Sequence, residues 1–198
     1  VRNVLNLLGE IFSKAVAEGY LKHSPMEGVD KPQADRDQKG RALKPDEIQS
    51  ILRSADGIDR IMIATAIVTG MRRAEQFGLD WSDIDFDHEV IKVRRSLYWQ
   101  FGKYHDREGE EPSYTYVTPK SKMSVRDIDM SPELCRELRG LYLKSGRKGL
   151  VFSSSKGTPL NPDNFVKRNF AAVLKGAEVE RAKHRLPAIG KVRWHDLR

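Results

Sequence analysis

The sequence has one cysteine, Cys135, so it can form no internal disulfide. This usage fits a reducing compartment and predicts a cytoplasmic protein. Long hydrophobic runs are also missing, because the longest strongly apolar stretch, 61–68, is far too short to cross a bilayer. The first residues show no basic region followed by an apolar core and a cleavage site. These absences argue against disulfide-stabilised secreted proteins and membrane-spanning proteins.

The sequence also lacks the residue spacing of a metal site. The histidines show no zinc-ligand spacing. Asp83, Asp85 and Asp87 alternate as in a calcium loop, but such a loop needs glycine where His88 stands and glutamate where Arg94 stands. A turn with solvated carboxylates explains the three aspartates better. We therefore expect no metal and no cofactor.

What the chain has in excess is positive charge. Its 198 residues include 35 Lys and Arg against 28 Asp and Glu, which gives a net charge of +7. This balance favours a polyanionic partner, most simply nucleic acid, although a merely basic protein fits the charge equally well. Hydrophobic residues at 39% and charged residues at 32% indicate a globular fold rather than a disordered chain.

The pattern along the chain divides it into three parts. In residues 1–24, apolar residues recur at three- and four-residue steps and predict an amphipathic helix that ends near Gly19. Residues 25–42 are polar, with glycine and proline, and predict an interdomain linker. Residues 43–198 then form a second domain, which the pattern predicts to be α+β and mostly helical, with a small antiparallel three-stranded sheet.

Helices of the second domain are expected at 45–54, 58–69, 132–144 and 161–175, with a further one starting at 194. Gly70 interrupts the second of these, and another helix is expected to run through Ala74 and Phe77. Strands are expected at 90–98, 114–118 and 125–130, and a shorter one at 150–152. The second and third strands would form a hairpin with a turn around Lys122. Cys135 lies on the apolar stripe of its helix and is expected in the core.

Three separated stretches carry the residues of a phosphate-cleaving site. They are Thr-Gly-Met-Arg-Arg-Ala-Glu at 69–75, Thr-Pro-Lys-Ser-Lys at 118–122 with Arg126 beyond it, and His-Asp-Leu-Arg at 195–198. Leu43, Glu47 and Ile48 precede the first stretch. In this order the motifs resemble those of the tyrosine recombinases, the phage integrase family, and the resemblance covers essentially the whole chain.

The chemistry of these residue types stands without the family name. Cleavage of a phosphodiester builds negative charge on the non-bridging oxygens, and two guanidinium groups can bind those oxygens through paired N–H donors. Such preorganised charge is usually the largest catalytic contribution. A lysine can protonate the departing 5′ oxygen, and a histidine can bind the phosphate or relay a proton.

The resemblance implies a role for each matching residue. Arg72 and Arg198 would bind the scissile phosphate, Lys120 would be the general acid, and His195 the second acid/base group. Glu75 would support the site by pairing with a basic side chain. The family's tyrosine attacks DNA to give a 3′-phosphotyrosyl intermediate, so neither metal nor ATP is needed. The Thr-Gly spacing selects Arg72 over Arg73, and the hairpin pattern selects Lys120 over Lys122 and Lys103.

The family's tyrosine lies downstream of His-x-x-Arg, whereas this chain ends at Arg198. None of its six tyrosines occupies that place, so we expect this chain to bind DNA weakly without cleaving it. By the same resemblance, residues 1–24 would be the last helix of a core-binding domain, and 43–198 a catalytic domain incomplete at its C-terminus. Family members act as homotetramers on two double-stranded DNA sites.

Further basic residues are candidates for DNA contact, against the simpler interpretation of a solvated basic surface. Arg73 and Lys122 adjoin the site, and Lys167 and Arg168 lie on the 161–175 helix. A denser basic segment follows, comprising Arg181, Lys183, His184, Arg185, Lys191 and Arg193. Contacts to backbone phosphates would position the enzyme without reading sequence and would make binding strongly salt-dependent.

Two alternatives remain open. A type IB topoisomerase shares this chemistry but would relax supercoils alone, and the long segment before the first motif resembles the integrase arrangement better. A DNA-binding protein that has lost catalysis would not need Arg72, Lys120, His195 and Arg198 together. The favoured prediction is a site-specific recombinase of a phage, prophage or other mobile element, used for DNA integration.

Overall fold

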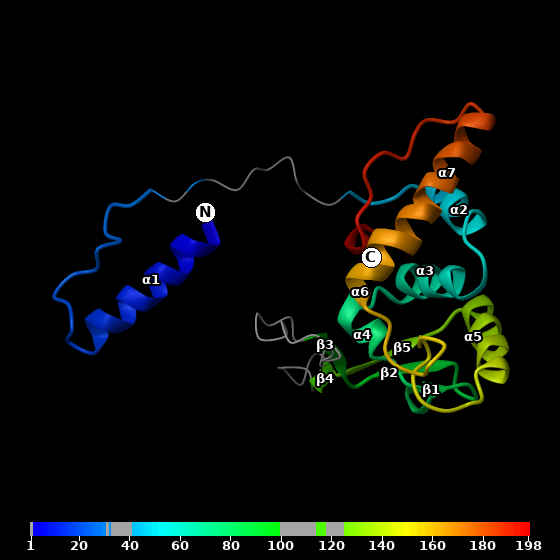
Figure 1. Ribbon diagram of the computed structural model, residues 1–198, viewed down its shortest axis with the longest axis horizontal. Coiled ribbons are helices and arrows are strands. Elements are labelled where there is room, and N and C mark those ends of the chain that lie inside the picture. The colour runs from blue at the N-terminus through cyan, green and yellow to red at the C-terminus, as the bar shows by residue number, and fades with distance from the viewer. Residues whose placement is uncertain (1, 31, 33–40, 100–113, 118–124) are drawn as a thin grey trace. The chain divides into compact units, whose positions relative to one another are not determined.

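The computed structural model describes residues 2–30, 32, 41–99, 114–117 and 125–198 (Figure 1). The chain divides into two compact units, Val1–Lys39 and Gly40–Arg198. Within the described ranges, no helix is both long enough and apolar enough to cross a membrane.

The smaller unit contains one helix, α1 (Arg2–Ala17), where the apolar periodicity predicts it. The chain turns at Gly19, whose φ of 79° suits glycine, and the amide of Tyr20 donates to the carbonyl of Ala15 at 2.8 Å. The apolar stripe of α1 is open: the exposed fractions of Val4, Leu7 and Ile11 are 59%, 58% and 52%.

Most helices of the larger unit begin at the residues that the sequence marks. They are α2 (Pro45–Arg53), α3 (Gly57–Thr69), α4 (Arg73–Phe77), α5 (Pro132–Lys144), α6 (Pro162–Phe165) and α7 (Ala171–Lys183). Ser131 caps α5 by accepting a hydrogen bond from the amide of Leu134. Asn161 caps α6 through its Oδ1, which accepts from the amides of Asp163 and Asn164. These caps and the prolines that follow them explain why the starts were predictable.

The helix that begins at Pro162 is longer than predicted. A π-helical turn, η4 (Val166–Phe170), joins α6 to α7, and the helix continues to Lys183 rather than ending near Lys175. The helix runs through Gly176, where a Cβ would lie 3.4 Å from the Cβ of Ser54, an ordinary van der Waals distance. The packing of α7 on α2 accompanies this longer helix.

The strands form two small antiparallel sheets. One has the order β1 (Ile84–Asp85), β2 (Val90–Val93), β5 (Arg126–Asp129), and the other pairs β3 (Ser96–Trp99) with β4 (Tyr114–Val117). A three-stranded antiparallel sheet is present as expected, but it contains β1 in place of the predicted strand at 114–118. The predicted single strand at 90–98 is divided at Arg94 and Arg95. The segment at 150–152 is wrong as a strand, since it contributes only an isolated bridge from Asp80 to Leu150.

The predicted hairpin between the strands at 114–118 and 125–130 is also wrong, because these two strands do not pair with each other. β4 pairs with β3 and β5 pairs with β2, with Ser96 opposite Val117 and Val93 opposite Arg126. β4 and β5 therefore follow one another along the 90–99 segment. Arg94 lies where the two sheets part, and its guanidinium donates to the carbonyl of Arg126 at 3.1 Å. A long alternating run could not reveal this break, because its pairing partners come from a distant segment.

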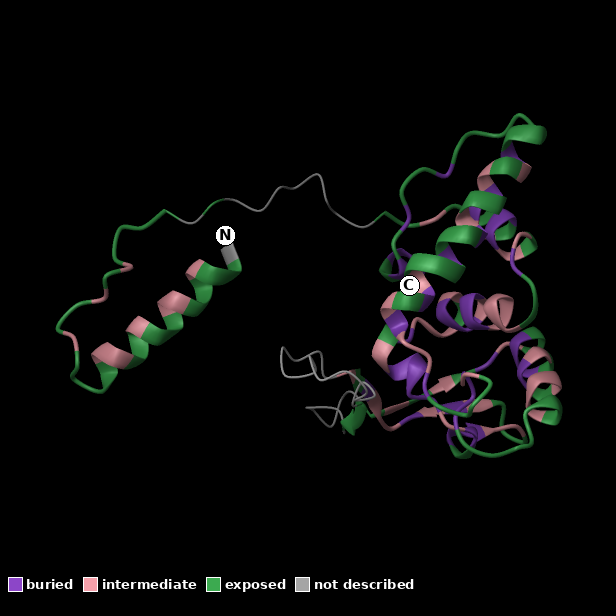
Figure 2. Cartoon of the chain, in the orientation of Figure 1, coloured by how far each residue is buried: buried purple, intermediate pink, exposed green. Residues whose placement is uncertain are grey.

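The core of the larger unit lies between the helices and the three-stranded sheet. In Figure 1 the strands occupy one end of this unit, α2 and α7 the other, and α3 and α4 lie between them. α2 packs on α7, and α3 packs on α5. The buried residues, purple in Figure 2, include Met62, Phe77 and Phe152, and Cys135 is among them as predicted.

Candidate active site

The first motif lies at the junction of α3 and α4. Gly70 ends α3 in a left-handed conformation with φ of 58°, and its amide donates to the carbonyl of Ala66. The chain then extends through Arg72, which precedes the first residue of α4. The side chain of Arg72 is 57% exposed. The glycine thus stops one helix early enough to present an arginine at the start of the next.

Glu75 binds two arginines beneath that surface. It is 2% exposed and accepts from the amide of Arg72 at 2.8 Å and from the guanidinium of Arg72 at 2.9 Å. Both terminal nitrogens of Arg126 also donate to it, at 3.2 and 2.9 Å. Burial alone would raise the pKa of Glu75, but the hydrogen bonds from Arg126 and Arg72 outweigh it and lower the pKa. The carboxylate therefore stays charged and orients Arg72.

The third motif forms a short 3-10 helix, η5 (Trp194–Leu197). Trp194 is buried, and its ring makes edge contacts with Phe77, Phe165 and Phe170 at centroid distances of 6.3, 5.5 and 5.1 Å. Asp196 and Leu197 are buried as well, which leaves His195 and Arg198 exposed. The aromatic ring thus anchors η5 so that its two charged residues face outward.

Arg198 joins the third motif to the first. Its Nε donates to the carbonyl of Gly70 at 2.8 Å, across 128 positions of sequence. Gly70 precedes Arg72 by two residues, so the fold brings both predicted phosphate-binding arginines to one region, and both remain open to solvent. His195 lies on the same turn of helix as Arg198.

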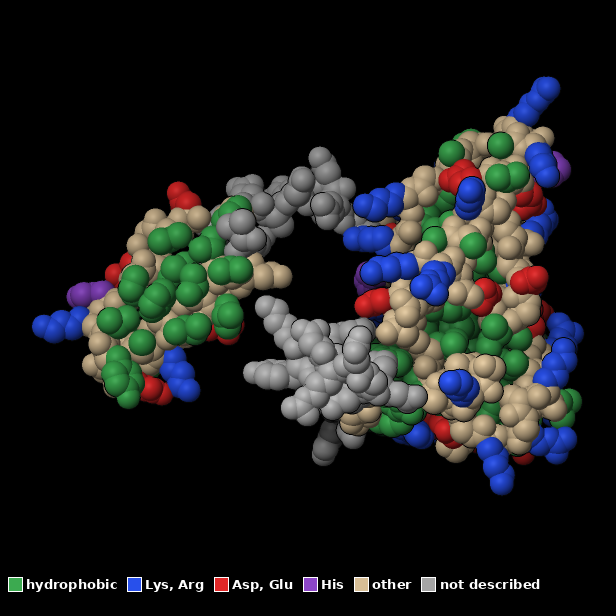
Figure 3. All heavy atoms as spheres, in the orientation of Figure 1, with side chains coloured by type: hydrophobic (Ala, Val, Ile, Leu, Met, Phe, Trp, Pro, Cys, Tyr) green, Lys and Arg blue, Asp and Glu red, His purple; other side chains and the backbone are tan. Residues whose placement is uncertain are grey.

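The other predicted site residues have varied surroundings. Lys120 and Lys122 lie outside the described residues. Arg73 pairs with Asp163 of α6 at 2.8 Å. Four further cations are exposed: Lys167 and Arg168 on η4, and Arg185 and Lys191 in the loop after α7. Figure 3 shows Lys and Arg side chains gathered on the larger unit near its C-terminal end.

Arg193 has a partner of its own. Its guanidinium donates to Asp196 at 2.8 Å, and its amide donates to the same carboxylate at 2.8 Å. The side-chain bonds of Arg193 are the main reason that the pKa of Asp196 is lowered. Arg193 therefore stabilises the start of η5, and its charge is partly neutralised before any DNA approaches.

Arg181 corrects the prediction of a basic DNA-contacting segment. It lies on α7, is 2% exposed, and donates to the carboxylate of Asp46 at 2.8 Å and the hydroxyl of Ser50 at 3.2 Å. Because α7 continues past Gly176, this arginine faces α2 rather than solvent. It is a structural cation.

Sequence reasoning also left two functional-looking arginines without a role. Arg126 binds Glu75, and Arg41 binds the buried Glu47 at 2.8 Å. Each arginine lies close in sequence to a predicted motif, which is the only signal that the sequence offers. Among the described residues, no group of three or more His, Cys, Asp or Glu side chains could hold a metal ion.

Comparison with protein families matches residues 41–198 to the family described as "Phage integrase family". The chain belongs to the phage integrase family. The match includes the Arg72 and the His195–Arg198 motifs and excludes α1. It confirms the family that the three sequence motifs predict.

Two relatives of the phage integrase family illustrate how much of the protein this chain spans. A XerC-like tyrosine recombinase of Caldanaerobacter subterraneus subsp. tengcongensis is 25% identical over 199 residues, which cover 90% of this chain and 50% of the relative. The ICEBs1 integrase of Bacillus subtilis is 30% identical over 142 residues, covering 70% of this chain and 35% of the relative. The chain spans half or less of the length of these relatives.

Solved structures of integrases share the fold. The Tn1549 transposon integrase in complex with transposon right end DNA aligns with a TM-score of 0.75 at 21% identity, covering 98% of this chain and 62% of that one. A lambda integrase tetramer bound to a Holliday junction aligns with a TM-score of 0.59 at 17% identity, covering 99% and 51%. This likeness confirms the predicted mostly helical fold with its small antiparallel sheet.

Proposed function

We propose that this chain is the catalytic part of a site-specific recombinase that cleaves and rejoins DNA through a 3′-phosphotyrosyl intermediate. The observation that carries the proposal is the hydrogen bond from Arg198 to Gly70, two residues before Arg72. Binding of a single phosphate by two arginines requires this proximity. The substrate is a double-stranded recombination site, and the reaction serves integration of a mobile element within the bacterial cytoplasm.

In the proposed reaction, a tyrosine oxygen attacks the phosphorus atom and the bond to the 5′ oxygen breaks. Arg72 and Arg198 donate hydrogen bonds to the non-bridging oxygens, where negative charge grows. Lys120 donates a proton to the departing 5′ oxygen, and His195 binds the phosphate or takes the proton of the nucleophile. Rejoining reverses these steps, so the energy of the phosphodiester is conserved.

Glu75 acts behind these groups. Its carboxylate fixes the Arg72 guanidinium and limits the rotamers that the side chain can adopt. Arg126 holds the same carboxylate from β5. A preorganised arginine loses less entropy when it binds the phosphate.

DNA binding would use the exposed cations around the site. Arg73, Lys122, Lys167, Arg168, Arg185 and Lys191 would contact backbone phosphates. Arg193 would contribute less, since Asp196 already pairs with it. A homotetramer on two DNA sites would match the assembly named for the lambda integrase bound to a Holliday junction.

The test is cleavage of a suicide DNA substrate by a chain that extends past Arg198 to the family's tyrosine. We expect Arg72→Ala and Arg198→Ala each to lower the rate of covalent complex formation by roughly 100-fold or more, because each removes preorganised positive charge. The covalent complex is measured by its retarded migration under denaturing conditions.

Arg136→Ala provides the matched control for those two variants. Arg136 is an exposed arginine of α5 that pairs with Glu133 at 3.4 Å. It removes the same charge without touching either motif, so the cleavage rate should stay near that of the unmodified protein. Undiminished cleavage by both site variants would overturn the proposed function.

A further inference from the structure

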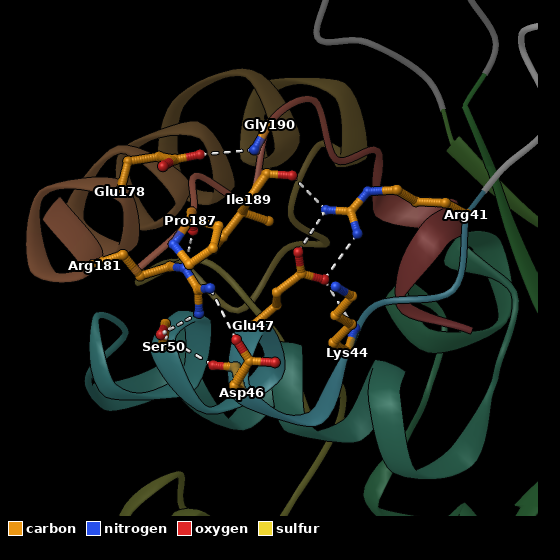
Figure 4. A network of polar contacts seen from close by, with 10 residues as sticks. All are labelled: Arg41, Lys44, Asp46, Glu47, Ser50, Glu178, Arg181, Pro187, Ile189 and Gly190. Carbon is orange, nitrogen blue, oxygen red and sulfur yellow. Dashed lines mark hydrogen bonds and ion pairs between the residues drawn. The ribbon is translucent and has the colours of Figure 1, made fainter. Parts of the chain in front are cut away.

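The loop between α7 and η5 carries the chain into His195 and Arg198, and side chains from other elements bond its backbone at Pro187, Ile189 and Gly190 (Figure 4). Two of these come from α7 itself. Arg181 donates through Nε to the carbonyl of Pro187 at 2.7 Å, and Glu178 accepts from the amide of Gly190 at 2.9 Å. These bonds fold the loop back on the helix that it leaves.

The third hydrogen bond comes from Arg41, at the N-terminal end of this unit in sequence. The Nη2 of Arg41 donates to the carbonyl of Ile189, 148 positions away in sequence. Ile189 is 4% exposed and belongs to the core, whereas Gly190 and Lys191 after it are exposed. Arg41 therefore contacts the loop at its first buried residue, six positions before His195.

A buried carboxylate holds Arg41 in place. Glu47 of α2 is 6% exposed and accepts from both terminal nitrogens of Arg41, at 2.8 and 3.1 Å. Its Oε2 also accepts from the amide of Lys44 at 2.8 Å, in the first turn of α2. Such a bidentate ion pair fixes the plane of the guanidinium. Arg41 cannot rotate away from Ile189 without breaking it.

Arg41 also lies within electrostatic range of η5. The hydrogen bond to Glu47 contributes most to raising the pKa of Arg41, and the charge of Asp196 raises it further. Asp196 is the buried residue next to His195 and pairs with Arg193. Arg41 is thus linked to both the loop and the helix that carry the third motif.

We propose that Arg41 is a positioning residue, which fixes the loop at Ile189 and thereby sets the placement of His195 and Arg198. This inference rests on the proposed function of those two residues. Its physical basis is that, among the described hydrogen bonds and ion pairs to residues 184–193, the bond from Arg41 comes from outside α7 and η5. Without it, only the core packing of Ile189 and Val192 would fix the loop against the rest of the unit, and Arg198 would be less precisely placed at Gly70.

The direct test is amide hydrogen exchange of the 198-residue chain. Arg41→Ala should speed exchange in residues 190–198 by roughly ten-fold or more, because it removes a charge-assisted hydrogen bond from the base of this segment. Arg41→Lys keeps the positive charge but loses the paired N–H donors of the guanidinium, so exchange should slow part of the way back to that of the unmodified protein. Unchanged exchange in β2 and α5 would show that the variants are folded.

Arg53→Ala is the matched control. Arg53 is an arginine of α2 that pairs with Glu180 of α7 at 3.7 Å, and within the described structure it makes no hydrogen bond or ion pair with residues 184–193. It should leave exchange in residues 190–198 unchanged. Equal changes in Arg53→Ala and Arg41→Ala, or no change in either, would overturn the proposal.

A second measurement separates positioning from DNA binding. In a chain extended to the family's tyrosine, Arg41→Ala should lower the cleavage rate at saturating DNA by roughly ten-fold, with DNA affinity changed by less than about three-fold. Faster exchange with an unaltered cleavage rate would refute the positioning role. If the unmodified protein itself fails to cleave, the proposed function fails, while the exchange result still decides whether Arg41 holds the loop.

Discussion

At the scale of single residues, the buried carboxylate of Glu75 connects segments that are distant in sequence. It accepts hydrogen bonds from Arg72, which precedes α4, and from Arg126 on β5, which lies 51 positions after Glu75. Both arginines are more exposed than the carboxylate, since their side chains are 57% and 31% accessible. The carboxylate of Glu75 is therefore buried, and the guanidinium groups of Arg72 and Arg126 lie between it and the solvent.

We expect Glu75→Gln to lower the free energy of unfolding by about 3 kcal/mol at pH 7, because it leaves two guanidinium groups without their charged partner. The loss should shrink as the pH falls. The pKa of Glu75 is lowered in the folded state from an ordinary value of 4.5, so its contribution is complete above that pH and is lost below it. Urea unfolding of both proteins at pH 7, 5 and 4 measures the difference.

Glu133→Gln is the comparison for that experiment, since Glu133 is a 71% exposed carboxylate paired with Arg136. Its effect should remain below about 1 kcal/mol at every pH, as expected for a surface pair. A difference between Glu75→Gln and the unmodified protein that stays constant from pH 7 to pH 4 would contradict the account of Glu75.

The sequence indicated some of these residues and not others, for a physical reason. Arg72 and Arg198 lie in short motifs whose spacing is visible along the chain. The partners of Arg126 and Arg181 lie 51 and 135 positions away, so no local pattern distinguishes these arginines from solvated ones. Arg181 was expected to contact DNA because its neighbours are basic, and burial reversed that interpretation.

At the scale of elements, the ring of Trp194 packs η5 against the core. Trp194 is 5% exposed, and its Nε1 is buried with no hydrogen-bond partner among the described residues. We expect Trp194→Ala to cost about 3–5 kcal/mol of unfolding free energy, because it leaves a cavity among three phenylalanine rings. Urea unfolding followed by far-UV circular dichroism measures this loss.

Trp194→Phe is the conservative partner of that variant. It keeps an aromatic ring against Phe77 and Phe170 and removes an N–H that has no described acceptor, so the cost should be clearly smaller than that of Trp194→Ala. Equal costs for the two substitutions would show that ring packing is not what anchors η5.

Helix starts were predictable because their signals are local: a cap and a proline stand together at Asn161 and Pro162. The division of the 90–99 segment at Arg94 was not predictable, because it involves a hydrogen bond to the carbonyl of Arg126, which is distant in sequence. The extent of α7 was not predictable either, because α7 packs on α2, a helix distant in sequence. Local chemistry thus marked helix starts and the end of α3 at Gly70, whereas tertiary contacts accompany the full length of α7 and the division of the 90–99 segment.

At the scale of the whole molecule, the larger unit contains all of the recorded core. Every buried or partly buried member of the hydrophobic cluster lies between Leu43 and Leu197. We therefore expect a chain of residues 41–198 to unfold cooperatively, with a free energy of unfolding within about 0.5 kcal/mol of that of the 198-residue chain. Urea unfolding of both chains at equal concentration measures it.

A chain that begins at Lys44 is the informative control for that truncation. It keeps α2 but lacks Arg41, so Glu47 loses its ion pair and the chain should be less stable than residues 41–198. Loss of a cooperative transition in residues 41–198 would instead mean that the smaller unit is needed for folding.

The arrangement of β4 and β5 has a consequence for evolution and for protein engineering. Both strands take their register from one continuous segment, with Val117 opposite Ser96 and Arg126 opposite Val93. Two residues, 94 and 95, separate the partners on one side, whereas eight, 118–125, separate them on the other. The register of each ladder is thus set by its partner in the 90–99 segment and not by the number of residues between β4 and β5. A residue inserted between the two strands should leave both ladders in register, so homologues can vary the length of this connection without re-registering either sheet.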